Sequence, residues 1–284
     1  MERRHIRQTA WVQGIALSLM MAAALTLNGC SDDEGSTGVS SGEGRVLLLM
    51  HDAPVDNFTE IWLTVESVSM IGAGVDDDST ASGNIVLDHA IRMDFLALDS
   101  VSMILADAEI EAGVYSKIRL EVSDPEFVRD DDSVFTGDDI HIVANGHVDL
   151  NSQGSGIVVE DGAITVVSLD LDAENSIEVN ETGSGRYILR PQIFIDSDLE
   201  SAQEVMLEGA QVVSIDAGGG TMIVELPGSG SMVSVEFNGE TQIINIGGLP
   251  LEIGAISIGT MVNIHGTLDL ETGTVTATQI SIAP

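Results

Sequence analysis

From Arg45 onward, apolar and polar side chains alternate along the chain in short runs separated by turn residues. In "YSKIRLEV" (115–122), the even positions carry Ser, Ile, Leu and Val, and the odd positions carry Tyr, Lys, Arg and Glu. Because successive side chains of a β-strand point to opposite sides, this period of two predicts strands with one buried face. Many short strands of this kind are typical of an antiparallel sandwich or barrel.

Turn signals between these runs refine the expectation. Asn145-Gly146 lies between "HIVA" and "HVDL". It predicts a two-residue hairpin, which would point His141 and His147 to opposite faces. Asp161-Gly162 predicts a turn between two further strands. Only Asp94–Ala106 has a helical pattern, and it is short.

The first 30 residues have the features of a secretion signal. Met1–Gln8 carries three arginines, and Ala10–Leu27 is almost free of charge and rich in Ala, Leu and Met. A basic segment followed by an apolar one is typical of a signal peptide. The apolar run ends in "LNGC", which resembles the lipobox of bacterial lipoproteins. That resemblance implies that residues 1–29 are a cleaved signal helix and that Cys30 receives the lipid.

Cys30 is the single cysteine of the chain, and the acidic run "SDDE" follows it. A nucleophilic cysteine would need positive surroundings that lower its pKa. A zinc site would need further cysteines or clustered histidines. We therefore expect attachment to the lipid bilayer through acylated Cys30, with an uncleaved signal anchor as the alternative. Residues 30–43 then form a flexible tether.

The chain is strongly acidic, with 46 Asp and Glu against 10 Lys and Arg and a formal net charge of −36. Proteins bind phosphate backbones through Lys and Arg, so this balance argues against nucleic acid as a partner. It favours high solubility and the attraction of hydrated cations instead.

Four blocks of the chain resemble domain of unknown function 4382, a family of bacterial lipoprotein ectodomains. They are "LLLMHDAPVDNFTEIWLTVESVSM", "AGVYSKIRLEV", "LDLDAENSI" and "YILRPQIFI", in that order. The resemblance covers Gly44–Asp196 and implies a β-sandwich without an established activity. We therefore predict a β-sandwich domain over residues 44–196.

An acidic linker over residues 197–206 precedes a second β-rich unit over residues 207–284. "LEGAQVVSIDAGGGTMIVEL", "IGTMVNIHGTLD" and "GTVTATQISIA" resemble domain of unknown function 5666, which implies a small OB-like barrel. Such barrels bind nucleic acids through basic grooves and stacked aromatics. This unit has no Lys or Arg and only Phe237 as an aromatic. The predicted fold class is all-β, with a cleaved N-terminal signal helix, an antiparallel β-sandwich and a small OB-like β-barrel.

Asp170 and Asp172 in "LDLDAEN" are the candidate metal ligands, because carboxylate oxygens suit Ca²⁺. On a strand, both would point to one face. The segment lacks the glycine turn and the bidentate glutamate of a calcium loop. The alternative is that these acids are solvated, or pair across the sheet with Lys117 and Arg119. We expect no cofactor apart from Ca²⁺ at this pair.

The histidines offer no larger ligand set. His147 and Asp149 share a strand face, but two ligands alone hold a metal poorly, so solvated positions are expected. His51 and His89 have no visible partners in the sequence.

Asp52 and Pro54 are predicted to form a structural turn. Asp52 ends the first strand, and its side chain can cap the local backbone while Pro54 restricts the next φ.

We expect a membrane-anchored cell-envelope lipoprotein that acts as a non-enzymatic binding or structural module. Its partner would be an envelope protein or a polysaccharide. Ser31 after the cysteine resembles an outer-membrane sorting signal, with the exposed face undetermined. One alternative is a carboxylate-dependent hydrolase of envelope or extracellular polymers, and another is a surface protein that binds divalent cations weakly. No catalytic residue is assigned.

Overall fold

The computed structural model describes residues 42–52, 55–72, 83–98, 100–152, 154, 156–179, 186–196, 199 and 202–283. The predictions for the signal segment and for Cys30 lie outside these residues. Strands dominate the described part, which confirms the all-β prediction. No helix among the described residues is long and apolar enough to cross a membrane.

The first region, up to residue 196, carries mostly short strands and a few single-turn helices. Its strands are β1 (Glu43–Asp52), β2 (Phe58–Gly72), β3 (Gly83–Leu87), β4 (Ile91–Asp94), β5 (Ser102–Glu111), β6 (Gly113–Arg129), β7 (Val134–Thr136), β8 (Ile140–Ile142), β9 (His147–Asn151), β10 (Ile157–Val159), β11 (Ile164–Leu171), β12 (Ile177–Val179), β13 (Tyr187–Leu189) and β14 (Ile193–Asp196). Its helices are η1 (Phe95–Leu98), η2 (Gly137–Asp139), η3 (Val143–Gly146) and α1 (Ala173–Ser176).

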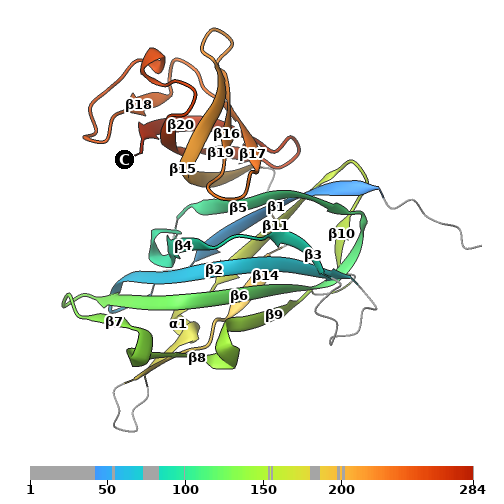
Figure 1. Cartoon of the computed structure of the whole chain (residues 1–284), viewed down its shortest axis with the longest axis vertical. Helices are drawn as coiled ribbons and strands as arrows, with labels where there is room; N and C mark the ends of the chain where they lie inside the picture. Colours follow the sequence, from blue (N-terminus) through green and yellow to red (C-terminus); the bar gives the residue numbers. More distant parts are fainter. Residues whose placement is uncertain are drawn as a thin grey trace, which may run out of the picture. The chain divides into compact units, whose positions relative to one another are not determined.

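The second region contains the remaining strands, drawn orange to red in Figure 1. They are β15 (Ala202–Asp216), β16 (Thr221–Glu225), β17 (Met232–Glu236), β18 (Gln242–Ile244), β19 (Met261–Asp269) and β20 (Thr274–Ile282), with the short helix η4 (Ile253–Ala255) before β19.

Three sheets account for the strands of the described residues. The largest has the order β14-β11-β1-β5-β15-β16-β17-β20-β18, with β19 pairing β15 and β20. The second has the order β10-β6-β2-β3, with β4 on β2 and with β7 and β9 on β6. The third is β12-β13-β8. Pairing in the sandwich region is mainly antiparallel, as predicted, but β1 and β11 run parallel.

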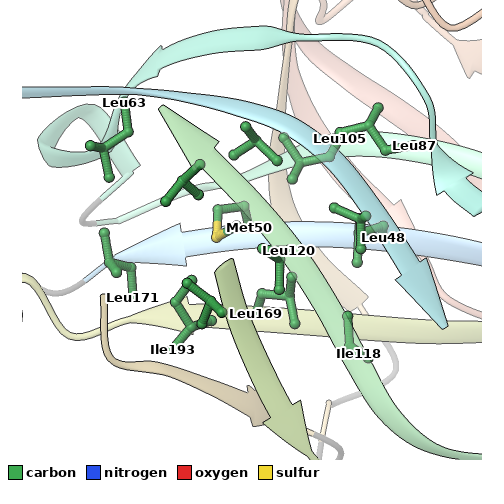
Figure 2. Packing of buried hydrophobic residues seen from close by; sticks show 14 of the residues in the cluster. Leu48, Met50, Leu63, Leu87, Leu105, Ile118, Leu120, Leu169, Leu171 and Ile193 are labelled. Carbon is green, nitrogen blue, oxygen red and sulfur yellow. The ribbon is translucent and has the colours of Figure 1, made fainter. Parts of the chain in front are cut away.

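The core of the sandwich lies between the large sheet and the second sheet. Leu48 and Met50 of β1 and Leu169 of β11 lie in one buried cluster with Leu63 of β2 and Leu120 of β6 (Figure 2). These side chains come from both layers, and each alternates with a residue on the other face of its strand. The period-two pattern therefore correctly predicted that Ile118, Leu120 and Val122 are buried, but it was wrong near the start of β6, where Tyr115 is buried and Ser116 is exposed.

The large sheet buries its other face as well. Leu47 and Leu49 of β1 and Ile104 of β5 belong to a second apolar cluster that also contains barrel residues such as Val205 and Val233. A strand covered on both sides reads as a continuous apolar run rather than as an alternating one. This explains the run "VLLLM" in β1.

The barrel closes through a circuit of five strands in the order β15-β16-β17-β20-β19 and back to β15. Only the β17–β20 pair of this circuit is parallel among the described strands. This is the predicted small OB-like barrel. Strand β15 also pairs with β5 at Val205–Ser102 and Met206–Met103, so the large sheet continues from the sandwich into the barrel.

The prediction of a two-residue hairpin at Asn145-Gly146 is wrong. Strand β8 pairs in parallel with β13, whereas β9 pairs with β6. Ala144, Asn145 and Gly146 all have positive φ, and a Cβ atom at Gly146 would lie 1.9 Å from the carbonyl oxygen of Val122. Three left-handed residues form a corner that moves the chain between sheets, and His141 and His147 therefore lie in different sheets.

The short helix predicted over Asp94–Ala106 is correct only in part. Phe95–Leu98 forms the 3-10 helix η1, but the residues from Ser102 onward form β5. The run from Ser102 to Ala106 is buried at every position. A short strand buried on both faces cannot be told from a buried helix by periodicity alone.

Candidate functional site

A crevice lies where the barrel meets the sandwich region within the described part of the chain. Its volume is about 420 Å³, and most of its lining is apolar. Small-molecule sites are commonly of this size, with few polar groups in an apolar wall. The lining residues are His89, Ala90, Ile91, Arg92, Met103, Ile104, Leu105, Glu208, Gly209, Leu226, Pro227 and Gly228.

His89 is the polar group of special interest in this crevice. Neither Nδ1 nor Nε2 is accessible to solvent, and neither has a hydrogen-bond partner among the described residues. Nδ1 lies 3.5 Å from Oδ1 of Asp88, whose side chain is mostly exposed. The same ring also lines a second cavity of about 270 Å³ beside the β16–β17 turn. His89 thus lines both cavities. Its two ring nitrogens could each form a hydrogen bond that the described residues do not supply.

The β16–β17 turn packs closely on this ring. Gly228 has a φ of +73°, and a Cβ atom there would lie 2.6 Å from Cδ2 of His89. Glycine is required at this position for two reasons, the left-handed backbone and the close approach of the imidazole.

A second contact fixes the same turn to β5. Ser231 donates its hydroxyl to the carbonyl oxygen of Asp107 over 2.9 Å. The carboxylate of Asp107 accepts from Nε of Arg45 over 2.6 Å and forms an ion pair with its Nη2. The hydrogen bond to Asp107 raises the pKa of Arg45 above its ordinary value. The junction around the crevice is therefore held by polar as well as apolar contacts.

Asp170, one of the predicted metal ligands, lies beside a histidine. It stands opposite His51 in the parallel β1–β11 pair, with His51 Nδ1 3.4 Å from Asp170 Oδ1. Ser168 lies two residues earlier on the same face of β11, opposite Leu49. Ser168 Oγ and Asp170 Oδ1 have no hydrogen-bond partner among the described residues.

Asp172, the other predicted ligand, does not lie on the strand. It caps α1 and accepts hydrogen bonds from N of Asn175 over 3.0 Å and from Nδ2 of Asn175 over 2.7 Å. Asp170 and Asp172 therefore have different surroundings. No group of three or more His, Cys, Asp or Glu residues that could hold a metal ion occurs in the described part of the chain.

Lys117 and Arg119 pair with neither of these acids. Both bind Asp149 of β9, with Arg119 Nε 2.6 Å from Oδ1 and Lys117 Nζ 3.3 Å from Oδ2. The hydrogen bond from Arg119 lowers the pKa of Asp149 to about 2. His147 and Asp149 are both exposed on one face of β9, as predicted.

Asp94 is a half-buried acid of the kind that an acid-base mechanism would need. Burial raises its pKa above the ordinary value. Its Oδ1 accepts from the backbone N of Ile61 over 2.9 Å and from that of Leu96 over 3.1 Å. It therefore connects η1 to β2, which is a structural role.

The remaining predicted residues are only partly described. The backbone of Asp52 ends β1 in register with Leu171, whereas its side chain, Pro54 and Cys30 lie outside the described residues. The contact of His51 with Asp170 and the packing of Gly228 on His89 were missed, because no local spacing connects residues so far apart in the chain.

These features define a β-sandwich joined to a small β-barrel, with a crevice at the junction. The chain belongs to the family described as Domain of unknown function (DUF4382), whose model matches residues 43–191. The match runs from β1 to β13, so β14 and the barrel lie beyond it. Neither a curated protein nor a solved structure matches the chain.

Proposed function

We propose that this protein is a lipoprotein of the bacterial outer membrane, anchored through acylated Cys30, and that its folded part is a non-enzymatic binding module. The binding site is the crevice at the junction of sandwich and barrel. The basic and apolar leader and the sequence "LNGC" support the anchor. The resemblance of the barrel segments to domain of unknown function 5666, a module common in envelope lipoproteins, supports the location.

The main support for a binding role comes from the two ring nitrogens of His89. Its two ring nitrogens are enclosed and unpaired in an otherwise largely apolar wall. An unpaired buried polar group costs free energy, and a ligand that reaches one of these nitrogens through a small movement of the ring recovers that cost. The lining therefore suits a small amphipathic molecule, with an apolar body and one hydrogen-bonding atom.

Catalysis by paired carboxylates has less support. Glycoside hydrolysis needs two acids on either side of the scissile bond. Among the described lining residues of the crevice, Glu208 is the only carboxylate. Binding is therefore the function that the crevice favours.

The binding role can be tested with indole, which has an apolar body and a single N–H donor. Calorimetric titration of the purified full chain should show saturable binding. Ala90 is exposed and lines the crevice, so Ala90→Trp should fill the space and abolish binding. Ala97 is also exposed and lies in η1, outside the crevice lining, so Ala97→Trp is the matched control and should bind as the wild type does. Equal binding by both variants would refute the crevice as the site.

The anchor is tested separately by Cys30→Ser. If Cys30 carries the lipid, this variant should leave the membrane fraction. A variant that loses its leader and yet remains bound to the membrane would contradict lipid attachment.

A further inference from the structure

A second cavity lies next to the crevice and shares His89 with it. The crevice has a volume of about 420 Å³ and the second cavity about 270 Å³. The two linings continue each other along two segments. Leu105 of β5 and Gly228 of the β16–β17 turn line the crevice, whereas Asp107 and Ser229 of the same segments line the second cavity. The two cavities are therefore neighbours on either side of His89.

The two cavities differ in chemistry. The wall of the crevice is mostly apolar. The second cavity has a mainly polar lining that includes Asp88 and the hydroxyl groups of Ser229 and Ser231, with no Lys or Arg among its described lining residues. An apolar space beside a polar one fits a ligand that has an apolar body and a polar end.

Three groups of the second cavity can accept hydrogen bonds from such a polar end. The side chain of Asp88 is 75% exposed, and among the described residues its carboxylate pairs only with Nδ1 of His89, over 3.5 Å. Ser229 Oγ accepts from N of Ser231 over 3.0 Å, and a hydroxyl oxygen has room for a second donor. A neutral imidazole has one acceptor nitrogen, and both nitrogens of His89 are unpaired. An ammonium group has three N–H donors and no acceptor, so it matches three acceptors.

The charges around the cavities favour a cation over an anion. Asp107 is already paired with Arg45, whereas Asp88 has no Lys or Arg partner among the described residues. Arg92 is the only Lys or Arg of the described crevice lining, and its guanidinium donates to Glu126 over 2.6 Å. An anionic ligand would therefore meet Asp88 with no unpaired guanidinium or ammonium group beside it. The net charge of −36 also attracts cations to the chain.

We propose that the crevice binds an amphipathic primary amine, whose apolar body fills the crevice and whose ammonium group enters the second cavity. Asp88, Ser229 and the acceptor nitrogen of His89 are the partners of the ammonium group. The His89 ring is held by packing against Gly228 and by no hydrogen bond among the described residues, so a small movement of the ring admits the ligand. This inference rests on the proposed binding function and names the class of its ligand.

The test compares three compounds that share the indole ring and carry different short tails. Tryptamine ends in an ammonium group, tryptophol in a hydroxyl group and indole-3-acetate in a carboxylate. Each is titrated calorimetrically into the purified full chain in high salt, which suppresses diffuse attraction to the acidic surface. Tryptamine should bind at least about tenfold more tightly than tryptophol, because charge-assisted hydrogen bonds are the stronger ones. Indole-3-acetate should bind most weakly.

Two variants that remove the same charge locate the ammonium group. Asp88→Asn keeps the shape of a mostly exposed side chain, so it should fold, and it should weaken tryptamine at least about fivefold while leaving tryptophol within about twofold. Asp138 is exposed in η2 and lines neither cavity, so Asp138→Asn should bind all three compounds as the wild type does. Ala90→Trp, which fills the crevice, should abolish the binding of tryptamine as well.

The outcomes separate this inference from the proposed function. If indole and tryptophol bind but tryptamine binds no more tightly, the crevice remains a binding site and only the amine assignment is refuted. Equal losses in Asp88→Asn and Asp138→Asn would also overturn that assignment, because they would indicate diffuse attraction to the acidic chain. If neither indole nor any of the three derivatives binds, the proposed function falls together with this inference.

Discussion

The sandwich region and the barrel differ in the side chains that hold their strands together. In the sandwich, Phe58, Phe127, Phe135 and Tyr187 form edge-to-face contacts with centroid separations of 4.8–5.9 Å. The barrel has Phe237 as its only aromatic, and no Lys or Arg follows Arg190. Aromatic pairs and ion pairs stabilise the sandwich sheets. The barrel relies on aliphatic burial and on a closed circuit of strands that leaves few edges.

The two regions nevertheless share one apolar cluster. Leu47, Leu49 and Ile104 belong to the sandwich strands but pack with the barrel core. The family match ends at residue 191, whereas this cluster extends across that limit. A domain defined by sequence similarity is therefore not the same as a set of residues that share a core. Four predictions test how strongly the regions depend on each other.

The largest effect is expected from the two faces of β1. Leu49→Ala and Leu48→Ala each remove a buried side chain, and each should lower the free energy of unfolding by about 2–5 kcal/mol. The two variants should differ in which strands lose protection of their backbone amides against hydrogen exchange. Hydrogen exchange should increase first in β16 and β17 for Leu49→Ala, and first in β2 and β6 for Leu48→Ala. If Leu49→Ala leaves barrel protection unchanged, the shared cluster does not couple the regions.

The Arg45–Asp107 pair should contribute more to stability than a more exposed ion pair does. Asp107 is 7% exposed in its side chain, so Arg45→Met leaves a nearly buried carboxylate unpaired and should cost about 3 kcal/mol. Arg92 pairs with Glu126 at a more exposed position, and Arg92→Met should cost about 1 kcal/mol or less. Urea unfolding of both variants measures the difference. Equal losses would show that burial of the pair has no effect on its contribution.

The turn that packs on His89 provides a matched pair of glycines. Gly228 and Gly230 have φ values of +73° and +66°, so alanine at either position costs about 1–2 kcal/mol for the left-handed backbone. Only Gly228→Ala must also displace the His89 ring, whereas a Cβ at Gly230 meets nothing within 4 Å. Gly228→Ala should therefore be less stable than Gly230→Ala by about 1–3 kcal/mol in thermal melts. Similar melts would mean that the turn can move away from His89.

The smallest effect concerns the outer face of the sandwich and its dependence on pH. The folded-state pKa of Asp149 is about 2, below the ordinary value of 3.8 for an aspartate. Its contribution to stability is therefore present above about pH 4 and is lost as the pH falls through 2. The side chain is partly exposed, so Asp149→Asn should cost at most about 1 kcal/mol at pH 7. In melts from pH 7 to 2, the difference from wild type should shrink strongly, and 1 M NaCl should reduce it at pH 7. A difference that persists at pH 2 would exclude the ion pair as its cause.

Several structural features were predicted correctly because they depend on neighbouring residues. Alternation in "YSKIRLEV" identified Ile118, Leu120 and Val122 of β6 as buried, although Tyr115 and Ser116 depart from the pattern. The resemblance of three segments within residues 207–283 to domain of unknown function 5666 implied the barrel, which the structure contains. The prediction of strand pairing failed where a strand pairs with a distant strand instead of with its neighbour in the chain. Asn145-Gly146 is a common hairpin signal, yet β8 pairs with β13 and β9 with β6.

The candidate sites show the same division. The sequence indicated Asp170 as a metal ligand but placed it with Asp172, because the two are close along the chain. In the fold, Asp172 turns away to cap α1, and His51 takes the place beside Asp170. His89 is a candidate ligand-binding residue only because the β16–β17 turn, which is distant in the sequence, packs against its ring.

By itself, the sequence determined the strand-rich fold class, the acidic character and the buried positions of β6 from Ile118 to Val122. These properties follow from local backbone geometry and from composition. Only the tertiary structure decided that β1 has two buried faces, that His51 meets Asp170, and that Gly228 lies against His89. Such contacts depend on the order and register of strands that are far apart in the chain. Many strand orders satisfy the same alternation, and the packing of the whole core selects one of them.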